Sequence, residues 1–237
     1  MKKISFNSFV SGFSIVVGLA SVLSGFGSRW GIWNFRTGFT ILRISAWGGL
    51  GIVVFSLFGI VLGQRSKTRA LLFIVFGMTI AAVPWNWIRT AKGAPAIHDI
   101  TTDTDHPPSF VAIIPLRMGV SNSAEYGGSE VAQKQKGAYP DLGTLVMNLP
   151  VDQTFSKALQ AAQKMGWKVV DFNPVEGRIE ATATTFWFGF KDDVVLRVLP
   201  TQDGSKIDMR SVSRVGKGDA GTNARRIREY FRILAQA

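Results

Sequence analysis

The chain of 237 residues is long enough for one large domain or two small ones, and its formal charge of +11 is unevenly distributed. All 16 acidic residues lie from Asp99 onward, so the positive excess belongs almost entirely to the first 98 residues. Those basic residues flank apolar runs, which indicates membrane orientation and argues against nucleic acid as a partner. The absence of cysteine excludes disulfides, thiolate metal sites and a cysteine nucleophile.

Three uncharged apolar runs occupy residues 8–26, 44–62 and 70–88. Each would form a helix of about 28 Å, enough to cross a hydrocarbon core of roughly 30 Å. We therefore predict that residues 1–94 form an anchor of three transmembrane helices. No ionisable residue lies centrally in any run, so a proton relay or ion pathway is not expected.

Tryptophans indicate which ends of the runs share one side of the bilayer. Trp30 and Trp33 follow the first run, and Trp85 and Trp87 end the third, where indole rings favour the interface. Lysine and arginine are equally frequent on the two sides of the bilayer. The turn at 64–69 carries three positive charges and would be the costliest loop to translocate. This predicts a cytoplasmic N-terminus, with the second half of the chain on the other side.

Glycines are frequent in the second run and just after it, at Gly48, Gly49, Gly51, Gly59 and Gly63. They allow neighbouring helices to approach closely. Dimerisation through them is the lesser alternative, because glycine is common in membrane helices in general.

Residues 95–143 are rich in Gly, Pro, Ser, Asp and Thr and show little periodicity, apart from a short apolar run at 110–116. We expect an extended connecting segment that wraps the following domain.

Both histidines of the protein, His98 and His106, lie in this segment with three carboxylates, Asp99, Asp103 and Asp105. Imidazole and carboxylate groups together can bind a divalent ion, but this spacing matches no metal motif. Asp, Thr and Pro are also typical of turns and extended chain. We favour a structural role, with a metal or catalytic role as the alternative, and expect no cofactor.

Residues 144–237 are predicted to form an α+β domain, an antiparallel meander sheet with two helices. A helix is expected to begin at Asp152, as N-cap, and to end at Gly166. A second helix ends the chain. Period-two alternation and turn residues predict strands at 167–172, 178–185 and 192–199, then a hairpin turn at 203–204 and a last strand.

One face of this sheet is apolar, and the two helices can cover it. The other face carries Glu180, Asp193, Arg197, Asp208 and Arg210. The favoured interpretation is that opposite charges pair in solvent, each pair contributing at most about 1 kcal/mol. The alternative is a polar ligand groove beneath the connecting segment.

A glycine corner between the last strand and the C-terminal helix consists of Gly216, Lys217, Gly218, Asp219, Ala220 and Gly221. Its GxGxxG spacing does not predict a dinucleotide site, which needs a following strand and an acid about 20 residues on. Backbone N–H groups of Gly216, Lys217, Gly218 and Gly221, with Arg214 nearby, could bind an anion. Capping of the helix by Asp219 or Thr222 is the favoured role.

Several motifs resemble the bacterial domain of unknown function 1499 family. They are PAIHDITTD at 95–103, Pro107-Pro108, Gly166-Trp167, IEAT at 179–182, FWFGFKDD at 186–193 and RSVSRVG at 210–216. The resemblance covers about residues 95–235, and the preceding apolar runs resemble the anchor of membrane-tethered members. It implies a compact envelope-associated domain without an assigned activity. The candidate polar site comprises motif residues with reactive side chains: His98, Asp99, Asp103, Asp192, Asp193, Arg210 and Arg214.

We therefore expect a cell-envelope protein of the bacterial inner membrane with a periplasmic C-terminal domain. The domain is expected to bind a lipid, glycan or protein partner near the membrane surface rather than to catalyse a reaction. One alternative is a hydrolase or metal-dependent enzyme using His98, Asp99, Asp103 and His106. Another is a structural subunit of a membrane complex.

Overall fold

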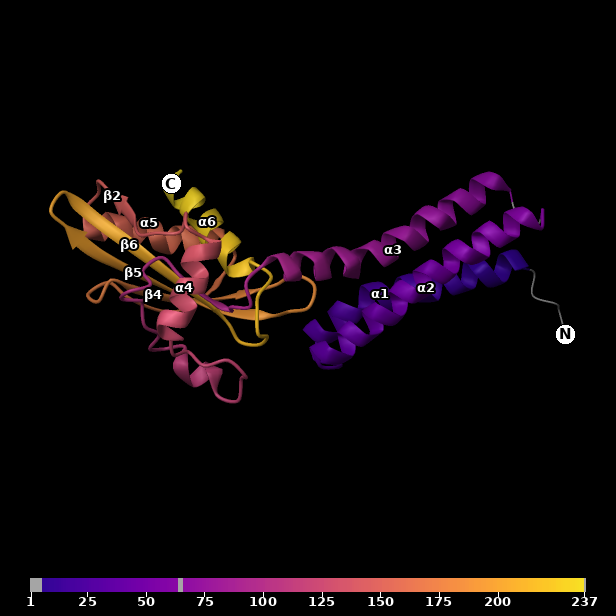
Figure 1. Cartoon of the computed structure of the whole chain (residues 1–237). Helices are drawn as coiled ribbons and strands as arrows, with labels where there is room; N and C mark the ends of the chain where they lie inside the picture. Colours follow the sequence, from indigo (N-terminus) through magenta and orange to yellow (C-terminus); the bar gives the residue numbers. More distant parts are fainter. Residues whose placement is uncertain (1–5, 64–65, 237) are drawn as a thin grey trace. The chain divides into compact units, whose positions relative to one another are not determined.

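The computed structural model describes residues 6–63 and 66–236 and divides into two compact units (Figure 1). The first comprises Met1–Arg89 and Phe186–Gly189, and the second comprises Thr90–Thr185 and Phe190–Ala237. The predicted membrane orientation depends in part on the charges of Lys2, Lys3 and Arg65. These three residues lie outside the described part of the chain.

Three long helices form the first unit: α1 (Phe6–Arg29), α2 (Phe35–Val61) and α3 (Lys67–Gly93). All three are long and apolar enough to cross a membrane, which confirms three membrane-capable helices where the anchor was predicted. Helix α2 begins well before its apolar run, because Asn34 caps it by accepting the backbone N–H of Thr37 at 3.0 Å.

The buried positions of α1 and α2 alternate in steps of four and three residues. They are Val10, Ser14, Val17, Ser21 and Ser24 in α1, after which the buried Gly25 and Gly27 depart from this spacing, and Gly38, Leu42, Ser45, Gly49, Ile52, Ser56 and Gly59 in α2. This 3.5-residue period is typical of coiled-coil packing, and the small side chains permit close approach. Gly49 also meets α3, since an added Cβ would lie 2.6 Å from the carbonyl oxygen of Gly77. Glycine thus serves packing within the anchor.

The aromatic corner Phe186–Gly189 belongs to this first unit. The indole N–H of Trp187 donates to the Val22 carbonyl at 2.9 Å, and the rings of Phe186 and Phe26 lie 5.5 Å apart. The corner therefore packs against the C-terminal half of α1.

The second unit contains a six-stranded antiparallel sheet. Its strands are β1 (Asp99–Thr101), β2 (Leu145–Met147), β3 (Lys168–Asn173), β4 (Arg178–Thr184), β5 (Lys191–Thr201) and β6 (Gly204–Ser213). The order is β1-β6-β5-β4-β3, and β2 pairs with the other end of β6. The predicted meander is the β3–β6 part, so the α+β fold class is confirmed. Strands β1 and β2 are too short to leave an alternating pattern in the sequence.

Helices α5 (Val151–Lys164) and α6 (Thr222–Ala235) cover one face of the sheet (Figure 1). Tyr230 is central to this core: its ring stacks on Trp167 at 5.2 Å, and its hydroxyl donates to the Ala158 carbonyl at 2.9 Å. The predicted N-cap of α5 is wrong, because Pro150 holds that position and Asp152 lies in the first turn. The connecting segment adds η1 (Ile114–Arg117) and α4 (Gly128–Ala138), which the sequence did not predict.

The polar face of the sheet is covered by parts of the segment between residues 102 and 126, so it does not face solvent as expected. Phe110 and Ile113 pack against Val195 and Val212, and Glu180 on the same face is fully buried. The prediction of solvated ion pairs is therefore wrong. A third layer of chain turns that face into a buried one.

Candidate functional site

Asp193 is the centre of the buried charge layer. Its carboxylate accepts hydrogen bonds from Arg117 Nη1 at 2.6 Å, from Arg214 Nε and Nη2 at 2.9 and 2.8 Å, and from the Thr182 hydroxyl at 2.8 Å. Asp193 and Arg117 are both almost completely buried. Buried charges are tolerated when they are paired and hydrogen-bonded, and this cluster meets both conditions.

Arg210 forms a second buried pair. Its Nε and Nη2 donate to the two oxygens of Asp99 at 3.0 and 2.7 Å, a bidentate geometry that fixes the guanidinium plane. The rings of Phe110 and Tyr126 lie 5.3 and 5.4 Å from its guanidinium carbon. Burial and the charge of Asp99 raise the pKa of Tyr126 to about 12, so its hydroxyl stays protonated at neutral pH.

Glu180 has a different role from that of the other carboxylates. Its two oxygens accept the backbone N–H groups of residues Val111, Ala112 and Ile113 at 2.9, 3.1 and 2.9 Å, and Arg178 pairs with it. A buried carboxylate thus holds the start of η1 on the sheet.

Asp103 lies at the opposite end of the polar face. Arg197 Nη2 bridges Asp103 and Asp208, at 2.9 Å from each. Burial alone would raise the pKa of Asp103, but the N–H groups of His106 and Asp105 and the guanidinium of Arg197 lower it overall. Asp103 is therefore ionised, and its carboxylate is occupied by hydrogen bonds within the fold.

Asp192 lies on the other side of the sheet, because successive strand residues point to opposite faces. It pairs with Arg226 of α6 at 2.5 Å, and Arg226 also donates to the Ser211 hydroxyl at 3.0 Å. The seven candidate residues therefore do not converge on one site. The structure joins Asp99 with Arg210 and Asp193 with Arg214, and it places Asp103, Asp192 and His98 apart from these pairs.

The two histidines are not grouped with the carboxylates as metal ligands. His98 is half-buried and uses its backbone carbonyl to accept the N–H of Ser213 at 2.9 Å, whereas His106 is exposed. Across residues 6–63 and 66–236, no group of three or more His, Asp or Glu side chains is placed to hold a metal ion. The hypothesis of a metal site at His98 and His106 gains no geometric support.

In the glycine corner, the carboxylate of Asp219 occupies backbone N–H groups that an anion would need. Gly221, and neither Asp219 nor Thr222, holds the N-cap position of α6. Asp219 nevertheless accepts the N–H groups of Gly221 and Asn223 at 2.8 and 2.6 Å, so its side chain satisfies donors at the start of the helix. Burial raises the pKa of Asp219 even though these two hydrogen bonds lower it. Arg214 binds Asp193 instead of the corner, so an anion there would compete with Asp219.

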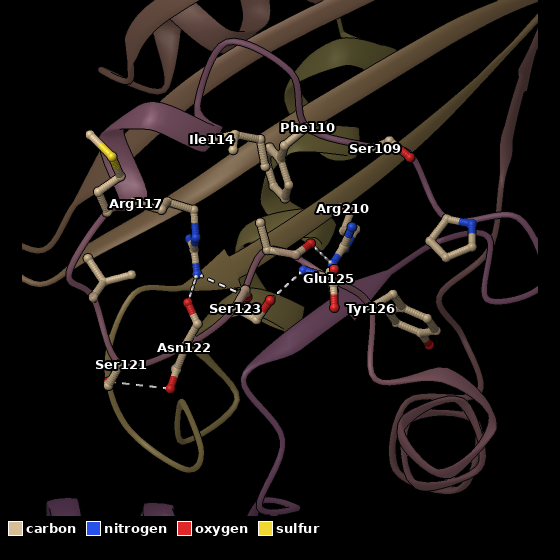
Figure 2. A pocket seen from close by; sticks show the side chains of 14 residues that line it. Ser109, Phe110, Ile114, Arg117, Ser121, Asn122, Ser123, Glu125, Tyr126 and Arg210 are labelled. Carbon is tan, nitrogen blue, oxygen red and sulfur yellow. Dashed lines mark hydrogen bonds between the residues drawn. The ribbon is translucent and has the colours of Figure 1, made fainter.

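A pocket of about 820 Å³ lies beside the two buried arginines (Figure 2). Among its lining residues are Ser109, Phe110, Arg117, Asn122, Tyr126 and Arg210. Arg117 Nη2 donates to the carbonyls of Asn122 and Ser123 at 2.9 and 3.3 Å, which shapes one wall. Arg117 Nε and the Tyr126 hydroxyl have no hydrogen-bond partner among the described residues. The pocket therefore combines rigid ion pairs with aromatic rings, and the two buried atoms without a partner belong to side chains that line it.

Sequence reasoning missed Arg117 and Tyr126, which lie in the segment without periodicity. One signal for Arg117 is its place directly after the apolar run 110–116, since an arginine that ends an otherwise apolar run can be drawn into the fold with it. No comparable signal marks Tyr126.

Fold and site together define a class: an α+β domain, preceded by three membrane-capable helices, with one sheet face closed over buried ion pairs and a pocket at its edge. The family described as "Protein of unknown function (DUF1499)" matches residues 99–234, more than half of the chain. The protein belongs to this family, which confirms the resemblance. None of the curated proteins compared with the chain matches it.

Proposed function

We propose that this protein is a binding protein of the bacterial cell envelope, anchored in the inner membrane by α1–α3. In this proposal the N-terminus is cytoplasmic and the α+β domain is periplasmic. The pocket beside Arg117 and Arg210 binds part of a lipid, a glycan or a protein partner near the membrane surface.

The observation that carries this proposal is that the charged groups behind the pocket are already engaged in ion pairs with one another. Arg117 is held by Asp193, and Arg210 is held by Asp99. Groups locked in such pairs are poor acids, bases and nucleophiles, but they hold the wall of the pocket rigid for a ligand. Rigid polar groups with aromatic and apolar neighbours are typical of binding pockets.

A hydrolase at this pocket has less support. Hydroxyl nucleophiles need an adjacent base, and no histidine occurs among the described residues that line the pocket. The pocket is also lined by the carboxylate of Glu125, but in the described structure this carboxylate is hydrogen-bonded to none of the lining hydroxyls. Ser123, one of the lining hydroxyls, instead accepts the backbone N–H of Glu125 at 3.0 Å.

Filling the pocket tests the proposal directly. Ser109 is exposed and lines the pocket, and Ser129 is an exposed serine in α4 that is not among the lining residues. Native mass spectrometry of the gently purified full chain is expected to show a reproducible bound mass in the wild type and in Ser129→Trp. Ser109→Trp is expected to bind the ligand at least about tenfold more weakly, which corresponds to about 1.4 kcal/mol, and therefore to lose most of the bound mass. An unchanged bound mass in Ser109→Trp, or none in the wild type, would count against this pocket.

The orientation is tested with single cysteines, because the chain has none of its own. Val175 is 98 % exposed in the turn between β3 and β4, and Ser66 is exposed just before α3. An impermeant thiol reagent added to spheroplasts is expected to label Val175→Cys at once and Ser66→Cys only after lysis. The opposite pattern would reverse the proposed topology.

A further inference from the structure

The loop of residues 111–118, here called the apolar loop, exposes an unusual amount of apolar surface. Val111, Ile114, Leu116 and Met118 are 56, 47, 50 and 82 % exposed. They are four of the seven large apolar side chains that are exposed in the described part of the second unit. Scattered exposed apolar residues are normal, but such a concentration marks an interaction surface.

The apolar loop is also held in this outward orientation. At its start, the Glu180 carboxylate accepts three consecutive backbone N–H groups, and Ile113 is buried against the sheet. At its end, the side chain of Arg117 reaches inward to Asp193 at 2.6 Å and to the Val212 carbonyl at 3.3 Å. The loop is therefore ordered before it meets a partner, which lowers the entropic cost of binding.

The surface presented by the loop is uncharged. All eight residues are described, and the one ionisable side chain among them, Arg117, is buried. Insertion into an apolar or interfacial environment would therefore desolvate no charge of the loop itself.

The short connection between the membrane-capable helix α3 and the second unit keeps the apolar loop near the bilayer. Five residues, 94–98, join the end of α3 to β1, and five extended residues span at most about 18 Å. A tethered surface meets the membrane at a high effective concentration, so a small apolar area is sufficient for contact. A soluble protein partner would have to be captured without that advantage.

We propose that the apolar loop inserts into the interfacial region of the bilayer in which the protein is anchored. Ile114 and Met118 also line the pocket, and Figure 2 shows Ile114 beside Phe110. The mouth of the pocket would then open next to lipid. This inference rests on the apolar loop and the anchor, and it does not depend on which ligand the pocket binds.

The test uses the full chain in liposomes with one fluorescent thiol label, at Met118→Cys or Leu116→Cys. Val175→Cys is the matched control, since its side chain is also highly exposed and lies on the same unit. Lipids that carry a nitroxide near the headgroup are expected to quench the labels at 116 and 118 several-fold more than the label at 175. Aqueous iodide should show the reverse order.

Two outcomes would overturn the inference. Iodide quenching at 116 and 118 equal to that at 175 would place the loop in water. Protection from both quenchers would show that a protein partner or a second copy covers it. Repeating the measurement with Ser109→Trp separates the two proposals, because filling the pocket should leave lipid quenching at 116 and 118 unchanged.

Discussion

Replacing Asp193 with asparagine is expected to lower the free energy of unfolding of the domain by about 3–5 kcal/mol. The substitution removes the negative charge but leaves Arg117 and Arg214 beside it, and Arg117 is almost completely buried. A buried cation without its partner keeps its desolvation cost and loses the compensating attraction. Because domains unfold with about 5–15 kcal/mol, this is a large fraction of the total.

Native-state hydrogen exchange of the full chain in detergent measures this effect, through the opening free energy of the β5 and β6 amides. Asp141→Asn is the matched control, since Asp141 pairs with Arg228 on the surface and both side chains are about half exposed. That change is expected to cost at most about 1 kcal/mol. Equal losses in the two variants would show that the buried cluster contributes no more than a surface pair.

Replacing Glu180 with alanine is expected to cost about 3 kcal/mol or more and to release the apolar loop. The N–H groups of residues 111–113 would lose their acceptor; that of Ile113 is buried and those of Val111 and Ala112 are partly buried. A buried donor left unsatisfied costs about 1–3 kcal/mol, and Arg178 loses a buried partner as well. Arg178 would keep its pairs with Asp171 and Glu176, so the damage should centre on the loop.

Hydrogen exchange again separates the outcomes. Amides at 111–113 are expected to exchange much faster in Glu180→Ala, while the β3–β4 hairpin retains most of its protection. Glu176→Ala removes a half-exposed carboxylate that also pairs with Arg178, and it should leave the loop amides protected. Loop amides that stay protected in Glu180→Ala would contradict the assigned role of Glu180.

These two carboxylates connect stability with the proposed function. Asp193 holds Arg117 against one wall of the pocket, and Glu180 holds the apolar loop at its mouth. Loss of either is therefore expected to weaken ligand binding and lipid contact through disorder of residues 110–126. Ser109→Trp should impair ligand binding alone, since Ser109 is exposed.

The local pattern of the sequence was sufficient to predict the three apolar helices and the central strands of the sheet. Uncharged runs of membrane-spanning length predicted α1–α3, because hydrophobic length is a property of the segment itself. Period-two alternation predicted β4 and β5 and their facing, since Val194, Leu196 and Val198 do enter the core with α5 and α6.

The environment of the polar face required the tertiary structure. The alternation showed that Glu180, Asp193 and Arg210 share a face, but it could not show that residues 102–126 would cover them. That segment has no periodicity, and its position depends on contacts with residues about 70 to 110 places away in the chain. The same charges would each be worth little in solvent, whereas burial makes them decisive for stability.

The sequence by itself determined a three-helix anchor, an antiparallel α+β domain and a family. Tertiary structure alone decided that residues 102–126 bury Asp193, that Arg117 and Tyr126 line a pocket, and that the apolar loop faces outward. The physical reason is that apolar periodicity is encoded locally, whereas burial of a charge depends on which distant partner the fold brings within hydrogen-bonding distance.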